Sequence, residues 1–156
     1  MHILLTRPLE DCSEMIMKFK SLGHQVSHIP LLIVDRIDHV EIDFSKYKGI
    51  IFTSANALRF LNLKKIDKKI LCFCVGGATE KIARSAGFQN LITAEGNVEN
   101  IKELILQNFE KKSGKLIYVS GEVVSEDLNS YLVKEGYDIN RVINYRAKHN
   151  QNFNEK

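Results

Sequence analysis

The chain has 156 residues, of which 44% are hydrophobic and 26% are charged, and its formal net charge is +3. This balance excludes wholesale disorder and indicates a globular protein that can bury one core and part of another. The small charge argues against a nucleic-acid-binding protein, and no apolar run is long enough to span a bilayer. Because the three cysteines are an odd number and the N-terminus lacks a signal-peptide pattern, we expect a cytoplasmic protein.

Residues 1–34 predict a strand, a helix and a second extended segment. The helix carries an apolar stripe and ends at Gly23. The extended segment 25–34 is interrupted by Pro30, which cannot donate a backbone hydrogen bond inside a sheet. We therefore expect the chain to leave its first sheet at Pro30. Residues 35–48 are polar and are predicted to be a connector.

Beyond residue 48, short apolar runs alternate with amphipathic helical patterns. The run 49–53 is apolar throughout, which is typical of a strand that is covered on both faces. Four helices are expected between five strands, which are predicted at 49–53, 69–75, 90–93, 115–119 and 139–145. This alternation predicts an α/β fold with a doubly wound, parallel, five-stranded sheet, which we expect to be flavodoxin-like.

Each predicted strand passes to the next helix through small or polar residues. Right-handed crossovers in a parallel sheet bring all such junctions to one edge, which we call the rim. The rim junctions are Thr53–Asn56, Gly76–Thr79, Glu95–Asn97 and Ser120–Glu122. Unpaired backbone N–H groups at these helix starts make the rim a candidate site for an anionic ligand. The alternative is a set of ordinary tight turns that serve backbone geometry alone.

Other kinds of site find little support in the sequence. The glycine-containing junctions match neither a phosphate-binding loop nor a dinucleotide fingerprint, and no nucleophile elbow or histidine triad is present. Cys72 with Cys74 and His24 with His28 lack further ligands at metal-binding spacing, so we expect buried thiols and ordinary histidines. The lysines within 64–69 have no interleaved aromatic residues and predict a solvated loop. The residues alone leave the ligand of the rim open.

Several short stretches, read in order, resemble the uroporphyrinogen-III synthase family over residues 3 to about 147. They are Ile3–Pro8, Leu22-Gly23, Pro30, Gly49–Ala57, Val75-Gly76 with Thr79, Gly121, Gly136 and Tyr145-Arg146. The resemblance implies two α/β domains, in a chain that starts in one domain, builds the second entirely and returns to finish the first. We therefore expect residues 1–34 to begin a discontinuous and incomplete domain, residues 35–145 to form a complete α/β domain, and residues 146–156 to start the return as a polar tail.

The resemblance also implies a reaction in haem biosynthesis. Members of the family close hydroxymethylbilane, a linear tetrapyrrole, into uroporphyrinogen III with its last pyrrole ring inverted. Water is lost, and no cofactor or metal takes part. The implied partner is this small molecule, with no nucleic acid and no membrane, and a chain with a complete first domain is expected to be a monomer.

The resemblance assigns roles to individual residues. Tyr145 is the expected catalytic residue, because a neutral tyrosine hydroxyl can donate a hydrogen bond to the departing hydroxide. The alternative is a half-buried strand tyrosine with a satisfied hydroxyl. Arg7 and Arg146 are further sources of positive charge, and the alternative for Arg7 is a structural hinge residue. The expected substrate-binding residues are Thr53, Ser54, Ala55, Gly76, Gly77, Thr79, Gly96, Asn97, Gly121 and Arg7.

The sequence departs from the family pattern after residue 147, where the family continues with more strands and helices. Because two strands and one helix bury little surface, we expect residues 1–32 to be poorly anchored. Two other interpretations stay open, namely an inactive truncated relative and a non-catalytic anion-binding α/β module. A receiver-like module is the weaker form of the second, since the rim junctions offer only Glu95 and Glu122 as acidic residues.

Overall fold

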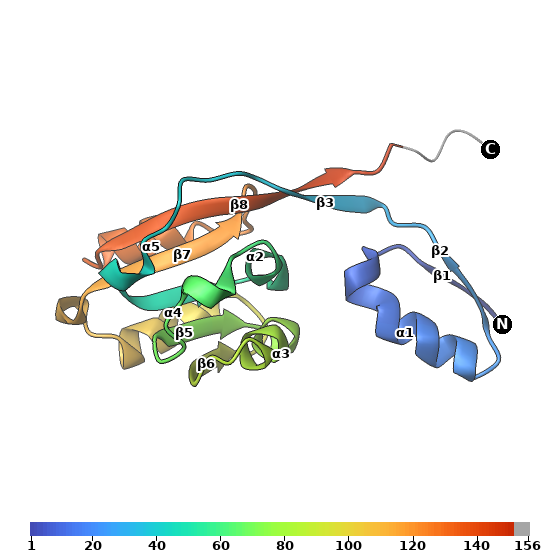
Figure 1. The fold of residues 1–156 in the computed structure, drawn as a ribbon, viewed down its shortest axis with the longest axis horizontal. Helices are drawn as coiled ribbons and strands as arrows, with labels where there is room; N and C mark the ends of the chain where they lie inside the picture. The colour runs from blue at the N-terminus through green and yellow to red at the C-terminus, as the bar shows by residue number, and fades with distance from the viewer. Residues whose placement is uncertain (152–156) are drawn as a thin grey trace. The chain divides into compact units, whose positions relative to one another are not determined.

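The computed structural model describes residues 1–151, and the chain divides into two compact units. Unit 1 comprises Met1–Asp35 and the segment from Arg146 onward, and unit 2 comprises Arg36–Tyr145. The chain therefore begins in unit 1, builds unit 2 without interruption and then returns (Figure 1).

No helix within residues 1–151 combines the length and the apolar composition needed to cross a bilayer.

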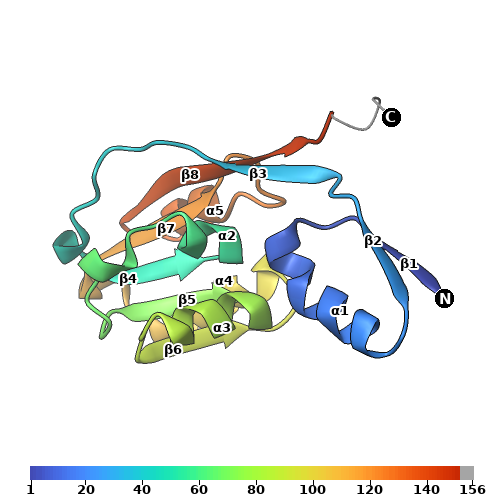
Figure 2. The ribbon, with the colours of Figure 1, turned by 45° about the vertical axis from the view of Figure 1, so that its right-hand side comes forward.

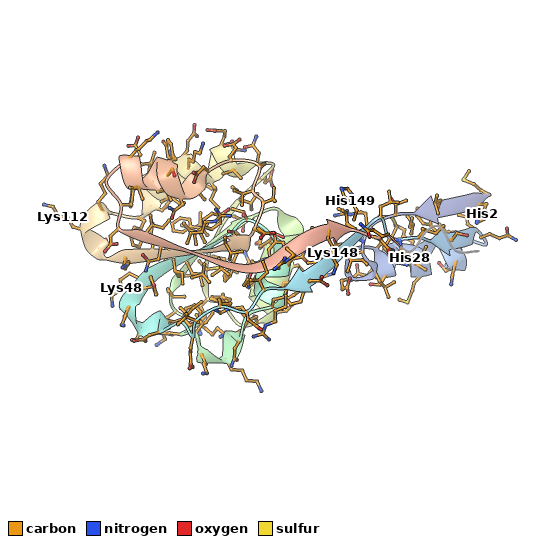
Figure 3. All side chains as sticks on the ribbon, turned by 90° about the horizontal axis from the view of Figure 1, so that it is seen from above. His2, His28, Lys48, Lys112, Lys148 and His149 are labelled. Carbon is orange, nitrogen blue, oxygen red and sulfur yellow. The ribbon has the colours of Figure 1, made fainter. Side chains whose placement is uncertain are left out.

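Unit 1 contains a helix and a two-stranded parallel sheet. Its elements are β1 (His2–Leu5), α1 (Leu9–Ser21) and β2 (Gln25–His28). The sheet pairs His2 with Gln25 at one end and Leu5 with His28 at the other. Figure 3 labels His2 and His28 in this sheet, and the His28 ring Nε2 lies 2.8 Å from the backbone carbonyl oxygen of Arg7.

Unit 1 buries few side chains. Within its described residues only Cys12, at 1% exposure, is buried. Large apolar side chains are exposed from its helix, its strands and the turns between them, among them Leu4, Leu9, Met15, Met17, Leu22, Ile29 and Leu31. A unit with so little apolar burial gains little stability from its own core. That residues 1–32 are poorly anchored stays a prediction.

The chain leaves the first sheet at Pro30, as predicted. The strands that follow and return are β3 (Leu32–Arg36) and β8 (Ile139–His149), which are neighbours in a second, six-stranded sheet. Ile37 N donates to the Asn144 carbonyl and Asn150 N donates to the Leu31 carbonyl, both at 2.9 Å. Because the residue number falls along one strand as it rises along the other, β3 and β8 run antiparallel.

Unit 2 contains most of the second sheet, whose strand order is β3-β8-β7-β4-β5-β6 and in which β4 to β8 are parallel (Figure 2). Its strands are β4 (Tyr47–Phe52), β5 (Leu71–Val75), β6 (Asn90–Ala94), β7 (Lys115–Gly121) and most of β8. Its α-helices are α2 (Ala55–Arg59), α3 (Gly77–Ser85), α4 (Val98–Asn108) and α5 (Leu128–Lys134). Short 3₁₀ helices are η1 (Phe44–Lys46), η2 (Leu63–Lys65) and η3 (Lys111–Ser113).

Helices cover both faces of the unit 2 sheet. On one face, Ile50 and Phe52 of β4 pack in a hydrophobic cluster with residues of α2 and α3. On the other face, Ile51 packs in a hydrophobic cluster with residues of α4 and α5. Successive side chains of a strand point to opposite faces, so the continuous apolar run in β4 is explained by burial on both sides. The predicted α/β fold with a mostly parallel, doubly wound sheet is confirmed.

Three details of the predicted fold are wrong, two in the sheet and one in a helix. The sheet has six strands rather than five, because the end of the predicted extended segment 25–34, together with Asp35 and Arg36 of the predicted connector, pairs with β8 as β3. The strand order places β4 centrally, with β5 and β6 on one side and β7 and β8 on the other, which is not the flavodoxin order. The helix predicted at about 55–63 ends at Arg59, because Asn62 caps a separate 3₁₀ turn by accepting from Lys64 N.

Cysteine labelling tests the anchoring of unit 1. We expect native-state alkylation to modify Cys12 at least about tenfold faster than Cys72 or Cys74, equivalent to about 1.4 kcal/mol in opening free energy. The reason is that Cys12 is covered by a unit with almost no other buried residue, whereas the other two lie in the main core. Mass spectrometry of the alkylated peptides over time gives the three rates, and labelling in denaturant is the control. Equal protection of Cys12 and Cys72 would contradict the prediction.

A pair of glycine substitutions tests the packing of unit 2. A methyl group on Gly49 would lie 2.5 Å from Leu116 Cδ2 and 3.1 Å from Phe109 Cε2, both in the buried core. We expect Gly49→Ala to lower the free energy of unfolding by about 1–3 kcal/mol. Gly77→Ala is the control, since nothing lies within 4 Å of its added methyl group, and it should be neutral or stabilising by about 0.5–1 kcal/mol. Urea denaturation measures both, and equal values would refute the packing argument.

Candidate functional site

The structure brings the four rim junctions to one edge of the unit 2 sheet. Strands β6, β5, β4 and β7 are successive neighbours and all pair in parallel, so their carboxyl ends point the same way (Figure 2). The chain leaves β4 toward β5 on one side and leaves β7 toward β8 on the other. The gap between the ends of β4 and β7 is therefore a topological switch point, the place where open α/β sheets bind ligands.

The junction after β4 contributes Thr53, Ser54 and Ala55, all half-buried. Thr53 Oγ1 lies 3.0 Å from the hydroxyl of Tyr118 on β7, which links the two strands that form the switch point. Ser54 Oγ accepts a hydrogen bond from Asn56 N at 3.2 Å and so caps α2. A serine hydroxyl that accepts in this way can still donate its own proton to a ligand.

The junction after β5 contributes Gly76, Gly77 and Thr79. Gly76 has φ +82°, a conformation that side chains rarely adopt, and its N–H donates to the Ala94 carbonyl at 3.0 Å. Gly77 is exposed as the first residue of α3, and the first N–H groups of a helix have no intrahelical acceptor. Thr79 is only 3% exposed, so this junction presents backbone N–H groups rather than the threonine hydroxyl.

The junction after β6 contributes Gly96 and Asn97, both exposed. Gly96 has φ +93°, and Asn97 Oδ1 accepts from Asn100 N at 3.2 Å, so Asn97 caps α4 as the sequence pattern predicts. Asn100 Nδ2 donates back to the Glu95 carbonyl at 2.5 Å. The turn is thus closed by its own hydrogen bonds and presents the start of α4 at the rim.

Tyr145 lies against the junction after β7. It pairs with Gly121, and its carbonyl accepts from Glu122 N at 2.9 Å. A methyl group on Gly121 would come within 2.7 Å of the tyrosine Cζ and 2.9 Å of its hydroxyl oxygen. The ring also stacks on Phe60, with centroids 6.5 Å apart and 29° between the planes. The absence of a side chain at Gly121 therefore makes room for the tyrosine at the rim.

Two residues that the sequence did not single out organise the switch point. Arg141 donates from Nε to Ser120 Oγ at 2.8 Å and from Nη2 to the carbonyls of Gly121 at 2.8 Å and Glu122 at 3.1 Å. Tyr118 is fully buried, and burial raises the pKa of its phenol, so its hydroxyl is neutral and bonded to Thr53. In the sequence, Arg141 could have been noticed as an arginine inside an otherwise apolar strand pattern. The pattern around Tyr118 indicated only a core residue.

Positive charge is distributed unevenly around this site. Arg7 and Arg146 belong to unit 1, so the rim of unit 2 includes neither. Figure 3 shows Lys48 and Lys112 at the edge where β4 and β7 begin, opposite the rim. Arg141 is a cation at the rim, but its Nε and Nη2 already donate to the junction after β7, so backbone N–H groups and hydroxyls are the groups suited to hold an anion there.

The described residues contain no group of three or more histidine, cysteine, aspartate or glutamate side chains placed to hold a metal ion. Cys72 and Cys74 are buried on one face of β5, and their sulfur atoms lie 3.8 Å apart. The adjacent Cys74 thiol and burial raise the pKa of Cys72, so it stays protonated. The prediction that these cysteines are buried thiols of the core is confirmed.

Comparison with known proteins assigns the chain to a family. The family model described as uroporphyrinogen-III synthase HemD matches residues 13–156. The porphyrin biosynthesis protein HemD of Ruminiclostridium josui is 25% identical over 169 aligned residues, which cover 97% of this chain and 33% of that protein. The chain thus spans about a third of the length of this curated relative.

Two solved structures share the fold. The uroporphyrinogen-III synthetase of Helicobacter pylori superimposes with a TM-score of 0.62 at 16% identity, covering 96% of this chain and 62% of that one. A mutant uroporphyrinogen III synthase of the extremely thermophilic bacterium Thermus thermophilus gives a TM-score of 0.54 at 13% identity, covering 96% and 63%. The chain spans less than two thirds of either structure.

Substitution of Arg141 tests its role at the switch point. Arg141→Met removes the hydrogen bonds that the guanidinium donates to Ser120 Oγ and to the carbonyls of Gly121 and Glu122, so we expect a loss of about 1–3 kcal/mol in unfolding free energy. The same substitution should accelerate hydrogen exchange at the Glu122 N–H, because the junction that Arg141 holds would open more often. Arg84→Met is the control, because Arg84 makes an exposed ion pair with Glu80 and should change stability by less than about 0.5 kcal/mol. Equal effects of the two variants would contradict the role of Arg141.

Proposed function

Because the chain belongs to the uroporphyrinogen-III synthase family, we propose that it acts in porphyrin biosynthesis by closing hydroxymethylbilane into uroporphyrinogen III. The observation that carries this proposal is the position of Tyr145, held between Gly121 and Phe60 at the rim of a doubly wound sheet. That position puts a phenol at the edge where open α/β sheets bind their ligands. No cofactor is required, because the reaction is a dehydrating cyclisation.

The rim offers groups suited to the carboxylates of the substrate. Backbone N–H groups at Gly77 and the hydroxyl of Ser54 lie at the starts of α3 and α2, where uncompensated helix donors favour negative charge. We assign substrate binding to the junctions at 53–55, 76–79 and 96–97. Thr79 acts through its backbone, because its side chain is buried. Gly121 acts by admitting Tyr145.

In the proposed reaction, the C–O bond of the substrate's hydroxymethyl group breaks and hydroxide leaves. The Tyr145 hydroxyl donates a hydrogen bond to the leaving oxygen and gives it the proton that completes water. The substituted carbon of the last pyrrole then attacks the resulting azafulvene cation and forms a spiro intermediate. In that intermediate the carbon–carbon bond from the last pyrrole to its original neighbour breaks, and the methylene carbon it releases bonds to the unsubstituted carbon of the same ring, which is thereby inverted. That carbon loses its proton as the ring regains aromaticity, and the proton restores the tyrosine. Orientation of the crowded carbon distinguishes this path from simple closure.

We propose that unit 1 needs further polypeptide for activity. Its described residues bury only one side chain while exposing apolar groups on its helix and strands. The uncovered apolar surface favours a unit that is stable only with more polypeptide packed on it. An inactive relative that binds the tetrapyrrole without cyclising it is the second candidate, and the same observation favours it.

Product analysis tests the synthase proposal. Hydroxymethylbilane is incubated with the chain alone and with the chain plus the part of the Helicobacter pylori synthetase that the chain does not cover. We expect uroporphyrinogen III in the second mixture, at a rate above spontaneous closure. If both mixtures contain only the uninverted isomer that spontaneous closure gives, the synthase activity is refuted, and tetrapyrrole binding without turnover would identify the inactive relative.

Tyr145→Phe tests the proposed proton donor. Removing the hydroxyl should lower kcat for uroporphyrinogen III formation by about 10²-fold or more, because general acid assistance is lost while the ring keeps its place. Tyr47→Phe is the control, since it removes a hydroxyl that accepts from Asn140 Nδ2 at the opposite edge of the sheet. An unchanged rate in Tyr145→Phe would exclude Tyr145 from the chemistry.

A further inference from the structure

The face that Tyr145 occupies breaks the alternation of its own strand. In β8, Ile139 packs in the cluster under α4 and α5, whereas Val142 packs in the cluster under α2 and α3. Because alternate residues of a strand share a face, Tyr145 should lie on the same face as Ile139. Instead it packs in the α2 and α3 cluster together with Val142.

A β-bulge at Asn144 causes this change of face. The pairing with β7 is regular as far as Ser120 opposite Ile143, and the next pair is Gly121 opposite Tyr145. Asn144 is thus the extra residue in β8, and a bulge of this kind redirects the side chain that follows it. As a result, two successive residues of β8 face the same side of the sheet. Asn144 contacts α2, and Tyr145 stacks on Phe60, the C-cap residue of that helix.

Asn144 is fixed at this position from two sides. Its Nδ2 donates to the carbonyl of Ala57 in α2 at 2.8 Å, and its own carbonyl accepts from Ile37 N at 2.9 Å. The side chain is fully buried, yet no described residue donates to its Oδ1. A buried amide with an unmet acceptor costs stability that an apolar residue would avoid. Because of this cost, we expect Asn144 to serve the local geometry of the strand rather than the stability of the fold.

We infer that Asn144 is a positioning residue: by anchoring the bulge to α2, it holds the Tyr145 ring between Phe60 and Gly121 at the rim. In a regular strand the phenol would point to the α5 face, where Arg141 already lies against the junction after β7. The role of Asn144 in catalysis rests on the proposed function of Tyr145, whereas its control of the ring position does not.

Fluorine NMR of the full chain tests this inference. The five tyrosines are labelled with 3-fluorotyrosine, and the Tyr145 resonance is assigned by Tyr145→Phe. In the otherwise unchanged chain, Phe60→Leu should shift this resonance, because the two rings stack. In Asn144→Ala the resonance should already be shifted, and adding Phe60→Leu should change it no further. Val142→Ala is the matched control, since it trims the same cluster from the same strand but leaves the Asn144 hydrogen bond intact.

The outcomes separate the inference from the proposed function. If the Tyr145 resonance in Asn144→Ala stays in place and still responds to Phe60→Leu, Asn144 does not position the ring, whatever the catalytic rate. If Asn144→Ala loses its dispersed resonances, Asn144→Ser, which keeps a hydroxyl donor, is judged by the same criterion. If the coupling to Phe60 is lost while kcat stays unchanged, the positioning role stands and the catalytic role of Tyr145 fails. If Asn144→Ala loses the coupling to Phe60 and also has a lower kcat at unchanged KM, the positioning role of Asn144 and the catalytic role of Tyr145 are both supported.

Discussion

The parallel pairing of β4 with β7 is the constraint on which the site depends. Four registered pairs, from Gly49 with Leu116 to Phe52 with Val119, fix the two strands side by side. Because β5 and β8 then extend the sheet in opposite directions, the carboxyl ends of β4 and β7 enclose the switch point. The Thr53–Tyr118 hydrogen bond links the two sides of this switch point, and the Arg141–Gly121 hydrogen bond holds the end of β7 against β8.

The rim combines a rigid frame with groups left free for a ligand. Strand pairing, helix caps and Arg141 satisfy most of the polar groups at the junctions, so little ordering would be left for a ligand to impose. Within residues 1–151, the groups available to a ligand include N–H donors at helix starts, the Ser54 hydroxyl and the phenol of Tyr145. This is a suitable arrangement for a reaction whose main demand is orientation rather than strong acid or base chemistry.

Local pattern predicted those parts of the structure that local physics determines. Pro30 ended a strand because it lacks a donor, and Asn97 capped α4 through its own side chain. What the sequence could not predict depends on contacts between distant residues. The pairing of β3 with β8, the bulge at Asn144 and the contacts of Arg141 each join segments separated by at least one helix. Tyr145 was named by resemblance, but the face on which it lies follows from the bulge.

The central claim, that the rim is the surface that meets the tetrapyrrole, is tested most directly by NMR titration. The amide resonances of the isotope-labelled chain are followed while uroporphyrinogen III is added under reducing conditions. The account predicts that shifts concentrate at residues 53–55, 76–79, 96–97 and 121–122, with the amide of Tyr145 among them. Shifts confined to the opposite edge, around Lys48 and Lys112, would contradict it.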